Sequence, residues 1–216
     1  LVRLVQELNP PDGMLVTPRM SDQHHIIEDA LRPVFSMPNV KRVRLMKGTA
    51  PHTNRHGSAE LILAKHVRDT YQKDARAYYH MKLVIAGVDY FDVAHHGAST
   101  GIWPWVGGDQ MRRYTRAIMM RELMAQRLPP AIVMRGHYHD RWIELVHIPS
   151  DGKMFKTWGL VCPGYSLFTD DYTLKQTKSK DYMTVGTMPI EIIDGRIVEI
   201  HDRAHTIHVA KREVLR

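Results

Sequence analysis

The chain has 216 residues, of which 44% are hydrophobic and 25% charged, and these are ordinary values for a globular protein with a core of its own. No apolar run approaches the roughly 20 residues of a membrane-spanning helix, and the N-terminus lacks the pattern of a secretory signal, so we expect no membrane contact. The single cysteine, Cys162, excludes an intrachain disulfide and favours a reducing compartment, most simply the cytoplasm. The net charge of +7 favours polyanionic partners such as nucleic acid or phosphorylated substrates.

Helical and extended patterns alternate in the first half of the chain. Residues 21–35 carry apolar side chains at helical spacing, and Ser21 is expected to cap that helix. Residues 40–48 alternate between apolar and basic side chains, which predicts a strand, and residues 58–72 predict a second helix. Residues 80–97 read as two strands, the second of which ends at a pair of histidines.

The second half is expected to contain more β-structure. The expected elements are a helix at 107–130, a strand and turn at 131–140, a strand at 142–149, a loop with a short apolar core at 158–168 and a β-hairpin at 188–203. Asp109 is the expected cap of the long helix, and Asp194-Gly195 the expected hairpin turn. The order of elements predicts an α/β or α+β layered fold, and we expect a single domain over residues 1–216.

Histidines gather after three of the apolar runs. The chain has 14 histidines, and the clusters are His52 with His56, His95 with His96, and His137 with His139. Loops at the C-terminal ends of strands form the crevice where ligands collect in open sheets. Neutral imidazole is the commonest metal ligand in proteins, so a Gly-His-x-His segment after an apolar strand predicts a metal site. The three clusters lie where they can converge on that site.

The Gly136-His137-Tyr138-His139 segment resembles the last metal-binding motif of the calcineurin-like metallophosphoesterases. The order of His52, His95 and this segment is similar to that in members encoded by tailed phages and prophages, and the resemblance covers roughly residues 12–200. It implies a four-layer β-sandwich flanked by helices that binds two divalent metal ions. Manganese is the first choice of metal, with iron, zinc or magnesium as alternatives. The implied reaction is hydrolysis of phosphate esters by a metal-activated water.

The resemblance also assigns roles to single residues. His95 and His137 would bind one metal ion and His139 the other, while His52 would be the catalytic group that protonates or steadies the leaving oxygen. From the residues themselves, Arg135 is either a phosphate-binding group or a solvated strand-end residue. Trp103 either stacks on a base or sugar or packs its loop against the core. The expected substrates are phosphate esters, with DNA or RNA phosphodiesters favoured, and for a phage protein the expected location is the host cytoplasm.

The chain also departs from the family pattern. Thr49 stands where the family has a metal-binding asparagine, and no Gly-Asp-x-x-Asp precedes Gly48. The Asp-x-His triplet before Gly48, Asp22-Gln23-His24, falls in an expected helix instead of following a strand. We therefore expect the N-terminal strands of the sandwich and the bridging aspartate to be missing, and the chain alone to be inactive. One alternative is a metallo-β-lactamase-like hydrolase, which the His95-His96-Gly97 segment also resembles. The other is a metal-free nucleic-acid-binding or structural module on the same scaffold.

Overall fold

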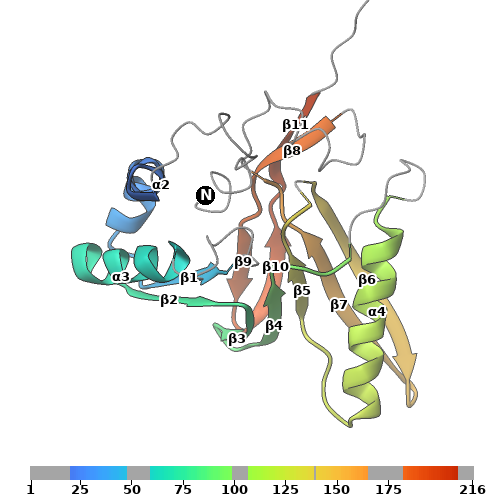
Figure 1. Cartoon of the computed structure of the whole chain (residues 1–216). Coiled ribbons are helices and arrows are strands. Elements are labelled where there is room, and N and C mark those ends of the chain that lie inside the picture. The colour runs from blue at the N-terminus through green and yellow to red at the C-terminus, as the bar shows by residue number, and fades with distance from the viewer. Residues whose placement is uncertain (1–19, 48–58, 99–106, 139, 165–181, 209–216) are drawn as a thin grey trace, which may run out of the picture. The chain divides into compact units, whose positions relative to one another are not determined.

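The computed structural model describes most of the chain, in the ranges 20–47, 59–98, 107–138, 140–164 and 182–208. The chain divides into two compact units, residues 1–79 and residues 80–216 (Figure 1). Compactness does not decide whether the two units fold independently. The single domain expected over residues 1–216 therefore stays a prediction. Among the described helices, none combines the length and the apolar composition that a membrane crossing requires.

The first unit holds two helices and a two-stranded parallel sheet. In chain order, the elements are α2 (Met20–Ser36), β1 (Arg42–Met46), α3 (Ala59–Tyr71) and β2 (Asp74–Tyr78). Both helices and β1 confirm the sequence-based prediction, although Ser21 lies inside α2 rather than before it. Strand β2 was not predicted, because its sequence DARAY offers only two alanines and a tyrosine as hydrophobic residues. It is extended because it pairs with β1 and because Ala75 packs fully buried beside α3.

The second unit is built on a five-stranded sheet with the order β3-β4-β5-β7-β6. The strands are β3 (His80–Ile85), β4 (Val88–Ala94), β5 (Ile132–Arg135), β6 (Trp142–Ser150) and β7 (Lys153–Val161). The three central strands run parallel, and β3 and β6 are antiparallel edges. Strands β4, β5 and β7 each contain a buried apolar run, as expected for central parallel strands that are covered on both faces.

Both faces of this sheet are covered (Figure 1). Neighbouring residues of a strand point to opposite faces, so Val133 and Val161 pack against helix α4 (Asp109–Met124), whereas Ile132 and Leu160 pack on the other side. That other side meets the hairpin of β9 (Ile190–Ile193) and β10 (Arg196–Ile200). The second unit is therefore a layered arrangement of helix, sheet and hairpin. The chain as described is a mixed α/β fold with several sheets.

The C-terminal strands form two antiparallel pairs, with the β9–β10 hairpin nested between β8 and β11 in the chain. The turn between β9 and β10 is Asp194-Gly195, with φ angles of 49° and 72°, so the predicted hairpin is confirmed. Strand β8 (Tyr182–Thr187) pairs antiparallel with β11 (Arg203–His208), and neither strand was predicted. Because β8 precedes β9 and β11 follows β10, the second pair continues the first.

Two local predictions in the second unit were wrong. A loop was expected at 158–168, but residues 158–161 form the end of strand β7. Leu160 and Val161 are fully buried there, between β5 and β6. A tight turn at Asp151-Gly152 feeds this strand, with φ angles of 48° and 72°. The cap of α4 is Gly108 rather than Asp109, and Gly108 is required because its φ is +81° and a Cβ there would overlap the Trp142 indole.

Candidate metal centre

Three imidazoles meet beyond the ends of β4 and β5. His95 and His96 directly follow β4, and His137 follows β5 by one residue. The ring centroids are 4.1 Å apart for His95 and His96, 4.3 Å for His96 and His137, and 5.0 Å for His95 and His137. One nitrogen of each ring lies within 4.8 Å of the other two. Such a spacing lets side-chain rotation bring all three nitrogens onto one ion.

The parallel register of β4 and β5 causes this convergence. Ala94 pairs with Arg135, so both strands end at the same edge of the sheet and their loops leave side by side. Two hydrogen bonds then join the loops: the Gly136 N–H donates to the His95 carbonyl (3.3 Å), and the Tyr138 hydroxyl donates to the Gly97 carbonyl (2.9 Å). These two hydrogen bonds fix the loops that carry the histidines relative to each other.

A buried ion pair lies directly under this edge. The Arg135 guanidinium is 2% exposed and donates to a carboxylate oxygen of Asp92 (2.5 Å), a side chain that is 1% exposed. The same guanidinium donates to the Asp92 and Met134 carbonyls at 2.8 Å. The other carboxylate oxygen of Asp92 lies 3.1 Å from Nε2 of His80. Removing one partner of such a pair leaves a buried charge without compensation, which is strongly destabilising.

Gly97 connects the ion pair to the histidine loop. A Cβ at this position would lie 2.7 Å from both Cγ and Cδ of Arg135. The Arg135 side chain cannot move aside easily because Asp92 holds its end. The loop therefore rests on the arginine side chain, and only glycine allows so close an approach.

The backbone of His137 is strained, and its neighbours differ in exposure. His137 has a φ of +84°, which is uncommon for a residue with a side chain, and such outliers gather at functional sites. The His95 ring is 4% exposed, His137 is half-buried and His96 is exposed. The cluster thus has one anchored imidazole and an open side that a small molecule can reach.

Some of the predicted site residues lie in this cluster and others lie outside the described residues. His95 and His137 come together as the sequence predicted. His52, His139 and Trp103 fall in stretches of the chain that the structure does not describe, so their roles stay predictions. The guanidinium of Arg135, predicted to hold phosphate, is buried and bound to Asp92 instead of facing solvent. In this position it supports the histidine loop.

The sequence placed His96 in one of the three histidine clusters, but no ligand role was predicted for it. Successive residues of a strand point in opposite directions, so a His-His pair inside a strand would place only one ring at the site. Strand β4 ends at Ala94, however, and both histidines belong to the loop after it, where the alternation no longer applies. The adjacency of His95 and His96 at a strand end was the available signal.

A second histidine group lies on the β9–β10 hairpin. Glu191 and Glu199 are cross-strand partners, and His201 lies between them, with 3.3 Å from Nδ1 to Glu199 and 3.6 Å from Nε2 to Glu191. Like charges directly opposite each other destabilise a hairpin, and an imidazole between them offsets that repulsion. Both glutamates are exposed, and we interpret this group as a surface ion-pair network.

Comparison with protein-family models gave no matching family, and comparison with curated proteins and with solved structures gave no match either. The resemblance to the calcineurin-like metallophosphoesterases therefore rests on the ordered histidine motifs alone. It stays a prediction, and so does each residue role that it implies.

Proposed function

We propose that the chain is a metal-dependent phosphoesterase whose metal centre includes His95, His96 and His137. The observation that carries the proposal is the convergence of three imidazole nitrogens, from the ends of two parallel strands, to within 4.8 Å of one another. The C-terminal edge of parallel strands is where open sheets with helices bind their ligands. Three histidines gathered there by chance, on a strained and hydrogen-bonded loop pair, would be unusual.

The residues present fit a borderline metal ion. A tetrahedral ion with metal–nitrogen bonds of about 2.1 Å separates its ligand nitrogens by about 3.4 Å, so only small side-chain rotations are needed. Within the described ranges of the chain, no carboxylate belongs to this group of ligands. Imidazole ligands suit zinc or iron, whereas magnesium and manganese prefer oxygen ligands. This donor set thus favours zinc or iron over the manganese that the family resemblance suggests.

The three histidines would have different tasks at such a centre. An ion held there would supply Lewis-acid polarisation of a phosphoryl oxygen and would make water a better nucleophile at neutral pH. Buried His95 would anchor the ion, because the Gly136 N–H fixes its backbone. His96 and His137 lie on the open side, where the substrate would approach. The proposal also includes His139 as a ligand of a second ion and His52 as the proton donor. These two roles are supported by the sequence motifs alone.

The finer fold and substrate assignments are part of the same proposal. The packing of the β9–β10 hairpin on one face of the five-stranded sheet, with α4 on the other, supports a relationship to the phosphoesterase sandwich. The motif order supports the phage and prophage type, and hence a cytoplasmic protein acting on phosphate esters. Nucleic-acid phosphodiesters are the substrates that the net charge of +7 favours.

The test is metal content, read together with hydrolysis. The purified chain, incubated with zinc, iron or manganese and desalted, should retain metal in stoichiometric amount. Hydrolysis of bis-p-nitrophenyl phosphate is the second readout, and it should stay low because the N-terminal strands and the bridging aspartate are expected to be missing. His96→Ala and His137→Ala should each lower retained metal severalfold, because each removes one of three ligands. The matched control is His147→Ala, an exposed histidine of β6 outside the cluster, which should change neither readout. Equal metal retention in all three variants would refute the centre.

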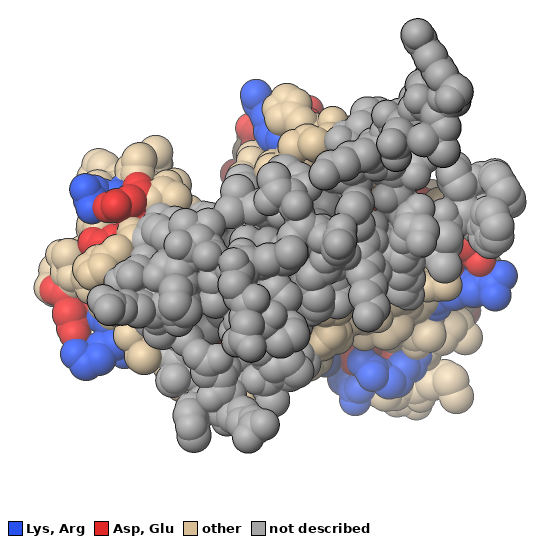
Figure 2. Space-filling view, turned by 45° about the horizontal axis from the view of Figure 1, so that its top comes forward, with Lys and Arg blue, Asp and Glu red and all other residues tan. Residues whose placement is uncertain are grey.

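The alternative function is a metal-free module that binds nucleic acid. On the face of the molecule in Figure 2, lysine and arginine side chains lie beside aspartates and glutamates at several places. Many described cations are also paired, for example Arg112 with Glu144 and Arg127 with Glu122. These pairings balance the charges of the cations concerned. An absence of retained metal, together with salt-dependent binding to DNA or RNA, would favour the metal-free module nevertheless.

A further inference from the structure

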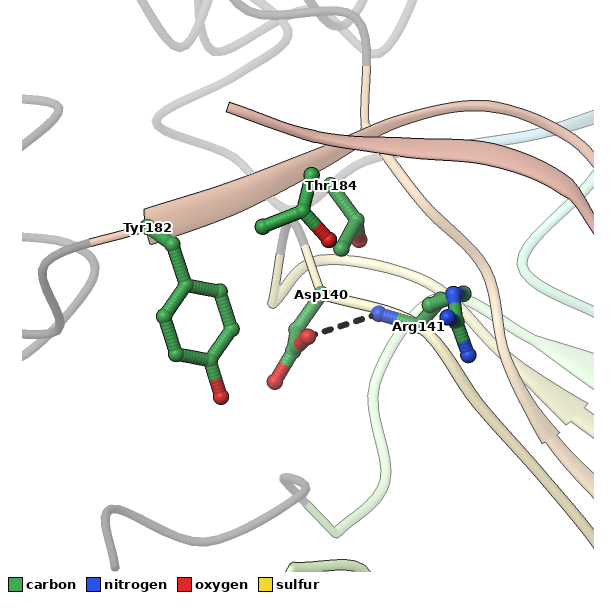
Figure 3. A pocket seen from close by; sticks show the side chains of 5 residues that line it. Asp140, Arg141, Tyr182 and Thr184 are labelled. Atoms are coloured by element: carbon green, nitrogen blue, oxygen red, sulfur yellow. Dashed lines mark hydrogen bonds between the residues drawn. The ribbon is translucent and has the colours of Figure 1, made fainter. Parts of the chain in front are cut away.

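A small pocket lined by polar residues lies between the start of β6 and the antiparallel pair of β8 and β11. It has a volume of about 290 Å³ and is lined by Asp140, Arg141, Tyr182, Thr184 and Thr206 (Figure 3). Tyr182 and Thr184 are two residues apart on β8, so their side chains lie on the same face of that strand. Thr206 of β11 is the cross-strand partner of Thr184. The volume is at the low end of the range for ligand pockets, which indicates a single ring-sized group.

Thr184 gives this pocket its clearest sign of a ligand. Its side chain is 3% exposed, and its hydroxyl has no hydrogen-bonding partner among the described residues. A buried hydroxyl without a partner is destabilising, so proteins seldom keep one without a reason. A ligand hydroxyl entering the pocket would supply the missing bond.

The charges of the pocket exclude an anion and favour a neutral ligand. The Asp140 carboxylate is 6% exposed and accepts the Arg141 backbone N–H at 2.8 Å. The Arg141 guanidinium is engaged by Asp202 at 3.0 Å, so its charge is already balanced. A carboxylate accepts hydrogen bonds but donates none, so a ligand group beside Asp140 would be one that donates.

Tyr182 adds a hydrogen-bond donor. Burial raises the pKa of its phenol, and the negative charge of Asp140 raises that pKa further, so the hydroxyl keeps its proton at neutral pH. In Figure 3 the phenol oxygen of Tyr182 and the carboxylate of Asp140 extend in the same direction from neighbouring elements. The pocket thus combines a charged acceptor with three hydroxyls that can donate or accept.

We infer that this pocket binds a ribose-type sugar ring through adjacent hydroxyls, with Asp140 accepting from the sugar and Thr184 completing its own hydrogen bonding. The inference rests on the proposed function, because the sugar would be the alcohol part of the phosphate ester. Asp140 follows His137 by three residues, so their Cα atoms lie at most about 11 Å apart. That is close enough for one nucleotide to reach from the metal centre to the pocket. A carboxylate that accepts from ribose hydroxyls is a general device for nucleotide recognition.

The experiment uses sugars without phosphate, so that it does not depend on metal or on catalysis. Binding of methyl β-D-ribofuranoside and of its 2-deoxy analogue to the full chain is measured by saturation-transfer NMR. The ribofuranoside should bind, and loss of one hydroxyl should weaken binding about fivefold, because a net hydrogen bond contributes about 1 kcal/mol. Asp140→Asn should weaken it about tenfold, because a charged acceptor makes the stronger bond.

Thr184→Val separates ligand recognition from folding. The variant removes the buried hydroxyl at nearly constant volume, so we expect a higher urea midpoint together with about fivefold weaker sugar binding. Thr187→Val, an exposed position on the same strand, is the matched control and should change neither. A structural role alone would make Thr184→Val less stable and leave binding unchanged.

Each outcome decides the inference. No binding of the ribofuranoside, equal binding of the deoxy analogue, or binding that Asp140→Asn and Thr184→Val leave intact would overturn it. The proposed function fails separately: sugar binding without metal retention by the histidines would keep the pocket and refute the phosphoesterase.

Discussion

Replacing Asp92 by asparagine would leave the Arg135 guanidinium buried without its compensating charge. Both side chains are almost completely buried, at 1% and 2% exposure, and the pair is joined at 2.5 Å. Removing one partner of a buried ion pair typically costs about 3–5 kcal/mol. The asparagine oxygen can still accept one hydrogen bond from Arg135, and the carbonyls of Asp92 and Met134 remain, so we expect a value near 3 kcal/mol.

The assay is urea unfolding followed by tryptophan fluorescence. All four tryptophans lie between residues 103 and 158, so the signal reports on the second unit. With a urea m value of about 2 kcal/mol/M, a loss of about 3 kcal/mol lowers the midpoint by about 1.5 M. The matched control is Glu144→Gln, which breaks a pair with Arg112 that is about one-third exposed on each side. We expect that control to lose only about 0.5–1 kcal/mol.

Similar midpoint shifts for Asp92→Asn and Glu144→Gln would refute the reasoning. Such a result would mean that the Arg135 guanidinium reaches water once its partner is neutral. An unchanged m value is part of the expected result, because the substitution should change stability and not the surface exposed on unfolding.

Two other predictions concern the histidine loop and the acid sensitivity of the second unit. Gly97→Ala places a Cβ 2.7 Å from the Arg135 side chain, so metal retention should fall severalfold and the free energy of unfolding by about 1–3 kcal/mol; wild-type values for both would contradict the packing described. The Arg127 guanidinium lowers the pKa of Glu122 to about 2, from an ordinary value of 4.5. Because the folded-state pKa is the lower one, the stabilisation is complete above about pH 5 and is lost as the pH falls toward 2. Urea midpoints at pH 7 and pH 3 should therefore differ more for the wild type than for Glu122→Gln, and equal differences would argue against the pair.

The sequence by itself determined the helices and strands whose residues show a clear hydrophobic period or a turn dipeptide. Helix α4, strands β4 and β5 and the Asp194-Gly195 hairpin each carry a clear period or a turn dipeptide, and all were predicted. The sequence also indicated that histidines follow strands, because His95 comes directly after one apolar run and His137 follows another with only Arg135 and Gly136 between.

Tertiary structure decided the elements whose own sequence is ambiguous. Strand β2 has only alanines and a tyrosine as hydrophobic residues, and it is extended because β1 pairs with it and Ala75 is buried beside α3. The end of strand β7, residues 158–161, was expected to lie in a loop, because Gly159 interrupts its apolar run. It is a strand because β5 and β6 flank it and satisfy its backbone hydrogen bonds.

For the candidate metal centre, too, the sequence determined some features and the tertiary structure determined others. The chain alone determined that imidazoles stand at strand ends. Only the parallel register of β4 and β5 brought His96 beside His137, since register depends on pairing between segments about 40 residues apart. The burial of Arg135 under Gly97 was likewise a result of packing: an arginine at a strand end has the same sequence pattern whether it faces solvent or an aspartate in the core.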